Sequence, residues 1–180
     1  MSVASLAILS IALTGGAPVG ITLGETHAKS CYDAAEAGNT SRFALASCER
    51  ALAVQPLSAG DKASTLVNRG IIRMNRGEYN LADRDFAEAL KLDASQAEAY
   101  LNAAILALRR ADSARALTYS SRSIELETRK PHIAYYVRGM ANEDRGAASA
   151  AYRDLQMAQS LAPGWDVPAI ELTRYSVVTR

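Results

Sequence analysis

Apolar residues recur along this chain at three- and four-residue intervals, in stretches long enough for helices and separated by short polar turns. One such stretch presents Leu66, Val67, Gly70, Ile71 and Met74. The stretch that follows presents Ala82, Phe86, Ala89, Leu90 and Leu92. Each predicts an amphipathic helix with one packed stripe. Gly77 lies between them, where glycine easily adopts the positive φ of a turn, so we expect a helical hairpin.

The hairpin pattern repeats with a period of 34 residues. Gly70, Gly77, Ala82, Ala89 and Leu92 recur as Ala104, Ala111, Ala116, Ser123 and Leu126, and after one inserted residue as Gly139, Gly146, Ala151, Ala158 and Leu161. A fixed period of this length is typical of an all-α solenoid, in which two-helix units stack on their neighbours. Solenoids act by surface recognition, so the repeat indicates a binding protein without naming its partner.

These repeats resemble the tetratricopeptide repeat (TPR). Signature positions of that family hold Gly70, Tyr79, Ala82, Phe86 and Ala89, although Leu66 replaces its Trp and Ala94 its Pro. The resemblance implies a right-handed superhelix of helical hairpins, with units at about 25–58, 63–96, 97–130 and 132–165 and a C-terminal capping helix and tail over 166–180. The first unit is degenerate, with Tyr32 at the small-residue position. A looser resemblance is to small secreted or periplasmic TPR proteins of alphaproteobacteria.

The first 24 residues carry no ionisable side chain. Their apolar run from Val3 to Leu13 has the length of a signal-peptide core and is shorter than the ~20 residues of a membrane span. We therefore expect export to a bacterial periplasm or beyond, with cleavage after Ala17 or Ala28. No basic side chain precedes the run, so the alternative is a buried N-terminal helix in a cytoplasmic protein.

Cys31 and Cys48 are the two cysteines of the chain. In an exported protein they favour one disulfide, which would join the two helices of the degenerate unit. In a cytoplasmic protein they would instead be reduced and buried in the helical core. Their spacing is not that of a redox or zinc motif.

Charge and composition argue against several other functions. A net charge of +1 lacks the basic surplus of a nucleic-acid binder, and 6% aromatic residues are too few for a stacking platform. His27 and His132 lie in different units without acidic or cysteine partners, so we expect no metal site. We also find no catalytic triad pattern and no phosphate-binding loop, and we predict neither a cofactor nor an enzyme.

The concave face is where TPR proteins bind their partners, so the resemblance implies a site on the first helix of each unit. The candidate partner-binding residues are Val67, Asn68, Ile71, Leu101, Asn102, Ile105, Arg109, Tyr136 and Met140. Their pattern is apolar through the middle with polar side chains beside it, which suits an amphipathic helix or an extended hydrophobic segment. Val67 and Ile71 stand where a carboxylate clamp of this family would need Lys and Asn.

Two functions follow as hypotheses. The first is a non-catalytic adaptor that binds a protein or peptide in this groove. The second is an oligomeric structural protein whose groove is filled by its own N-terminal segment or by a second copy, because exposed apolar grooves are seldom left bare. An enzyme would require acid and base groups gathered from several units.

Overall fold

The structure is a computed structural model that describes residues 26–175. The apolar segment expected to act as a signal lies outside this range. The described residues form helices α1 (His27–Glu36), α2 (Arg42–Val54), α3 (Ala59–Asn75), α4 (Tyr79–Leu92), α5 (Ala97–Arg109), α6 (Ser113–Glu125), α7 (Pro131–Asp144), α8 (Ala148–Leu161) and α9 (Asp166–Leu172). Between Thr26 and Tyr175, the secondary structure is therefore all-α.

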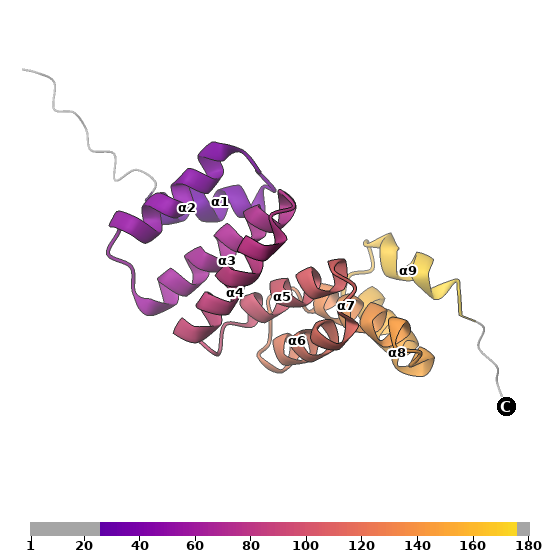
Figure 1. Cartoon of the computed structure of the whole chain (residues 1–180). Coiled ribbons are helices and arrows are strands. Elements are labelled where there is room, and N and C mark those ends of the chain that lie inside the picture. Colours follow the sequence, from indigo (N-terminus) through magenta and orange to yellow (C-terminus); the bar gives the residue numbers. More distant parts are fainter. Residues whose placement is uncertain (1–25, 176–180) are drawn as a thin grey trace, which may run out of the picture.

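The helices stack in chain order, from the indigo α1 and α2 at one end to the yellow α9 at the other (Figure 1). The hairpins are α1–α2, α3–α4, α5–α6 and α7–α8, and the second helix of each also packs on the first helix of the next. Helices α1, α3, α5 and α7 contact one another in a row. We call the face of this row the concave side, following the arrangement that the TPR resemblance implies, and α9 packs on α8 at the end of the stack.

Local sequence signals explain where the helices begin and turn. The side chains of Thr26, Ser41, Ser58 and Asp112 accept a hydrogen bond from a backbone N–H in the first turn of α1, α2, α3 and α6. Gly38, Gly77 and Gly146 adopt positive φ between the helices of their hairpins. The corresponding turn between α5 and α6 holds Ala111 at φ 57°, a conformation that strains a residue with a Cβ.

The two helices of each hairpin come close together at the same repeat position. Gly70 lies against the ring of Phe86 in α3–α4, and Gly139 lies against Leu155 in α7–α8. In α5–α6 this position holds Ala104 and Ser120, both fully buried. A glycine or alanine on the first helix lets the two backbones approach closely.

In α1–α2 the same position is taken by a disulfide between Cys31 and Cys48, whose Cα atoms are 4.8 Å apart. Both sulfurs are inaccessible to solvent. Tyr32 was expected at the small-residue position of this unit, and that expectation is wrong. Cys31 faces the second helix, while Tyr32 is exposed. The repeat positions of α1 are shifted relative to those of α3 because the α1–α2 turn contains more residues than the α3–α4 turn.

Of the helices in the described part of the chain, none is long and apolar enough to cross a membrane. The longest, α3, has 17 residues and carries charged side chains.

Candidate functional site

The concave side contains a cavity of about 140 Å³. Six of the nine candidate partner-binding residues line it: Val67, Asn68, Ile71, Leu101, Asn102 and Ile105. They come from α3 and α5, which the 34-residue period places side by side. The remaining lining residues are Ala35, Glu36, Glu98, Arg129, Lys130 and Ile133. We call this cavity the concave pocket.

The apolar part of the pocket has two levels. Val67 and Leu101 are 3% and 2% exposed, so they form its floor. Ile71, Ile105 and Ile133 are half-buried and line its sides. A partner would therefore touch the three isoleucines more than the two floor residues.

Two ion pairs frame the opening of the pocket. The Nζ of Lys130 lies 3.3 Å from each carboxylate oxygen of Glu36, although 94 residues separate the two in sequence. The end of α1 thus meets the segment that leads into α7. On the other rim, the Nε of Arg129 lies 3.3 Å from Oε1 of Glu98. Every charge on the rim has a partner of opposite sign.

Glu98 joins α5 to the segment before α7. Its Oε1 accepts hydrogen bonds from the backbone N–H of Arg129 at 2.9 Å and from the hydroxyl of Thr128 at 3.3 Å. Burial raises the pKa of Glu98, but the hydrogen bonds and charge of Arg129 outweigh it, so the pKa lies below its ordinary value. The carboxylate is therefore the form that the folded protein favours.

The two candidate asparagines differ in their hydrogen bonds. Asn102 donates from Nδ2 to the backbone oxygen of Glu98 at 2.8 Å. Asn68 is half-buried, and its amide makes no hydrogen bond to any other residue between 26 and 175. Its donor and acceptor atoms are consequently available to a ligand.

The pocket continues towards the N-terminal end of the solenoid as an open furrow. A depression of about 240 Å³ is lined by Tyr32, Ser64, Asn68 and Gln96, among others, and shares Glu98 and Arg129 with the pocket. A second depression, of about 350 Å³, shares Tyr32, Ser64 and Asn68 with the first and ends beside Thr26 and Gln55. Half of the residues that line the furrow are polar and uncharged, and its charged members are Asp61, Glu98 and Arg129.

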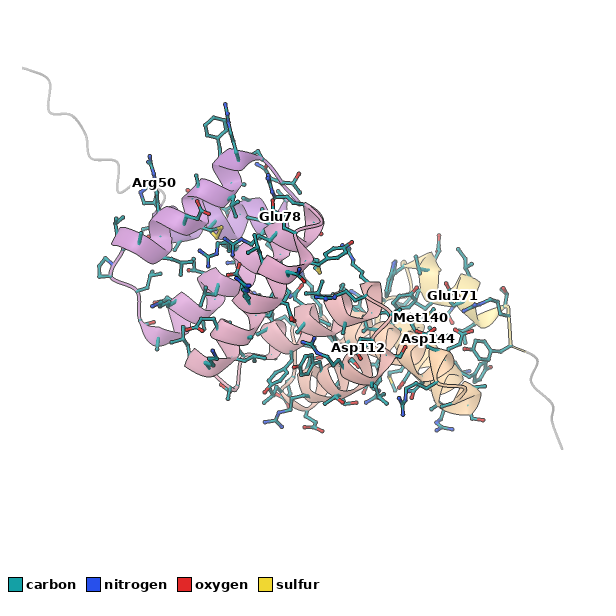
Figure 2. The ribbon with its side chains drawn as sticks, in the orientation of Figure 1. Arg50, Glu78, Asp112, Met140, Asp144 and Glu171 are labelled. Atoms are coloured by element: carbon teal, nitrogen blue, oxygen red, sulfur yellow. A yellow bond between two sulfur atoms is a disulfide. The ribbon has the colours of Figure 1, made fainter. Side chains whose placement is uncertain are left out.

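The other three candidate residues do not line the concave pocket. Arg109 is exposed near the end of α5. Tyr136 packs edge-on against Trp165, with 5.1 Å between ring centroids. Burial and, secondarily, the charge of Glu171 raise the pKa of the Tyr136 hydroxyl. Met140 lies in the C-terminal half of the molecule, where Figure 2 labels it with Asp144 and Glu171.

Six of the lining residues were not among those predicted from the sequence. The repeat phase was sufficient to find Glu98 and Ile133, because they occupy equivalent positions on α5 and α7. Arg129 and Lys130 precede α7, and the inserted residue there obscures the phase. Ala35 and Glu36 lie in the degenerate first unit, and their approach to the α7 segment depends on the curvature of the solenoid.

The disulfide is consistent with a non-reducing compartment. Among residues 26–175, no group of three or more His, Cys, Asp or Glu side chains is placed to hold a metal ion.

No protein-family model and no curated protein matches this sequence. Among solved structures, a crystal structure of MamA aligns with a TM-score of 0.63 at 22% identity, covering 78% of this chain and 78% of that chain. A second crystal structure of MamA protein aligns with a TM-score of 0.63 at 21% identity, covering 81% of this chain and 79% of that one. At this level of identity the likeness concerns the fold. Together with the stacked hairpins, it shows an all-α TPR solenoid, a right-handed superhelix closed by the capping helix α9.

Proposed function

We propose that this protein is a non-catalytic interaction module that binds a protein or peptide on its concave face. The observation that carries this proposal is the concave pocket, where residues from four helical units meet around one apolar cavity. A solenoid built of rigid hairpins presents such a surface without rearrangement. Ile71 and Ile105 would be the apolar anchors, and Asn68 would hydrogen-bond the partner's backbone.

The protein would work outside the cytoplasm, in a bacterial periplasm or beyond. The disulfide supports this location, as does the apolar run at residues 3–13. The looser resemblance to small secreted TPR proteins of alphaproteobacteria agrees with it.

The second candidate function is self-association through the same face. It is favoured by the half-exposed apolar side chains of the pocket, which a second copy would cover. This alternative predicts that substitutions in the pocket change the mass of the particle in solution.

Affinity capture from a cell-envelope extract of the host tests the first function. The bait is the disulfide-bonded chain, and Ile105→Glu is the variant expected to lose the partner. Leu81→Glu is the matched control, because Leu81 is an exposed apolar residue of α4 that does not line the pocket. Asn68→Ala is a milder variant that leaves the apolar packing intact.

A protein that is captured by wild type and Leu81→Glu, but lost with Ile105→Glu and weakened with Asn68→Ala, supports the proposal. Equal capture by all four baits contradicts it. Light scattering on the same proteins tests the second function, since a mass that falls only in Ile105→Glu indicates self-association. Circular dichroism melting confirms that each variant is folded.

A further inference from the structure

We propose that the concave pocket takes a single aliphatic side chain from an uncharged, extended segment of the partner. The proposal rests on the function proposed above and adds the chemistry of the ligand. It decides between the two ligands that the sequence left open, an amphipathic helix and an extended hydrophobic segment.

The size of the pocket favours a side chain over a helix. A helix with its side chains is about 10–12 Å across, whereas a cavity of about 140 Å³ is close to the ~150 Å³ cavities that hold one benzene-sized molecule. The ion pair between Glu36 and Lys130 links the end of α1 to the residue before α7, so it bridges the first and last units of the row beside the pocket. A helix would have to break that pair to lie along the row.

The walls of the pocket select an aliphatic group. Ile71, Ile105 and Ile133 surround it, and Val67 and Leu101 lie beneath. No aromatic ring lines the pocket among the described residues, so nothing there favours ring stacking. Leu, Ile, Val and Met match both the volume and the surface.

The rim disfavours a charged ligand. Glu36 is paired with Lys130 and Glu98 with Arg129, so each charge on the rim already has a partner of opposite sign. A charged residue entering here would lose water and gain no unpaired counter-charge. The paired charges of the rim therefore disfavour the C-terminal carboxylate of a peptide and favour an internal segment of the partner.

The furrow beside the pocket supplies partners for an extended backbone. The Asn68 amide is uncommitted, and Ser64 and Gln96 lie on the same path, bonded to each other at 3.0 Å. An extended peptide exposes N–H and C=O groups that need such partners when they leave water. The segment would run along the furrow and turn one side chain into the pocket.

Peptide display on the full, oxidised chain tests this inference. The library presents random twelve-residue segments flanked on both sides by scaffold, so that no free terminus is offered. We expect enriched peptides to be uncharged around one conserved Leu, Ile, Val or Met. Replacing that residue by Ala in a synthetic peptide, acetylated and amidated at its ends, should weaken binding about tenfold or more.

A variant with a filled pocket provides the matched control. Ile133→Phe occupies the cavity, whereas Ile124→Phe makes the same change at a half-buried position of α6 outside it. Binding of the selected peptide should be lost in the first variant and kept in the second, with both melting cooperatively. The same loss in both variants would overturn the assignment of the pocket.

The outcomes separate this inference from the proposed function. Enriched peptides that depend on Ile105 but are charged, or that bind as helices by circular dichroism, overturn the ligand chemistry and leave the groove function standing. Peptides whose binding is indifferent to Ile105→Glu and Asn68→Ala overturn the groove function itself.

Discussion

The hairpins α3–α4 and α5–α6 have the same backbone arrangement but different interiors. In α3–α4, Gly70 leaves room for the ring of Phe86. In α5–α6 the partners are Ala104 and Ser120, and the Ser120 hydroxyl donates to the backbone oxygen of Ala116 at 2.6 Å. From the first of these hairpins to the second, the second-helix side chain shrinks from Phe to Ser, while the first-helix side chain gains only a methyl group. The same repeat geometry therefore accommodates a glycine against a large ring in one hairpin and two small side chains in the other.

The two hairpins also differ in buried charge. Asp85 of α4 is 3% exposed and accepts hydrogen bonds at 2.7 Å from both Arg69 and Arg73 of α3. The corresponding three positions of α5–α6 hold Ala103, Ala107 and Tyr119. There the Tyr119 ring packs edge-on against Tyr100, with 5.9 Å between centroids. An ionic network and an aromatic contact thus occupy the same place between two helices.

The last hairpin, α7–α8, has the same kind of buried ionic network as α3–α4, with one change. Arg138 binds both oxygens of Asp154, at 2.7 and 3.0 Å, and Asn142 replaces the second arginine. Buried ion pairs often add little net stability, yet they are costly to break because one charge remains unpaired. The charged hairpins α3–α4 and α7–α8 should therefore be more vulnerable to a single substitution than α5–α6.

The largest effect is expected for Asp85→Ala. It leaves Arg69 and Arg73 facing each other without their carboxylate, and the Nε of Arg73 is already buried without a hydrogen-bond partner in the described structure. We expect a loss of about 3–5 kcal/mol in the free energy of unfolding, measured by urea denaturation. Tyr119→Phe at the same position of α5–α6 should cost less than about 1.5 kcal/mol. Equal losses would contradict the contrast between the hairpins.

The disulfide gives the next largest effect. In α1–α2 a covalent bond stands where the other hairpins have packed side chains, across a sequence separation of 17. Cys31→Ala together with Cys48→Ala should lower the free energy of unfolding by about 3 kcal/mol. A reductant should lower the stability of wild type by a similar amount and leave the double variant unchanged. A reductant-insensitive wild type would show that the bond does not form.

The contact of Gly70 with Phe86 gives a smaller effect. A Cβ on Gly70 would lie 2.5 Å from Cε1 of Phe86, so Gly70→Ala should cost about 1–3 kcal/mol despite alanine's better helix propensity. Adding Phe86→Ser copies the α5–α6 pair and removes the clash. In a double-mutant cycle by urea denaturation, the double variant should lose less than the sum of the single variants. Strict additivity would mean that the two positions do not share one space.

The hairpin architecture was predictable from the sequence because its signal is repeated. A small residue recurs at Gly70, Ala104 and Gly139, and a turn residue recurs at Gly77, Ala111 and Gly146. Three units in phase outweigh the loss of individual signature residues. The first unit was harder, because Cys31 of its disulfide stands where the other three units have a glycine or alanine.

The candidate site was only partly predictable. Ile71, Ile105 and the two asparagines follow from the phase of α3 and α5. The rim does not, since the pairing of Glu36 with Lys130 depends on how far the stack curves over three successive helix pairs. Small rotations add up along a solenoid, and local sequence does not encode their sum. Tyr136 also follows from the phase, but its ring packs edge-on against Trp165 and does not line the pocket.

The smallest effect on stability is expected from Glu98, a charged residue on the concave side of α5. The α5–α6 hairpin lacks the buried carboxylate of α3–α4, but Glu98 lies on its concave side, at the position that Ser64 holds in α3. Because the folded-state pKa of Glu98 is lowered, its contribution is present above its ordinary pKa of about 4.5 and is lost as the pH falls through the folded value. Arg129 is largely exposed, so the contribution should stay below about 1 kcal/mol.

Urea denaturation of wild type and Glu98→Gln between pH 3 and 7 measures this contribution. The stability difference should be greatest near neutral pH and should vanish towards pH 3, whereas the loss caused by Cys31→Ala with Cys48→Ala, which removes no titratable pair, should persist. High salt should also reduce the Glu98 difference, since an exposed ion pair is screened. A difference that grows as the pH falls would mean that the folded protein favours the protonated carboxyl. In that case burial would affect the pKa of Glu98 more strongly than the charge and hydrogen bonds of Arg129 do.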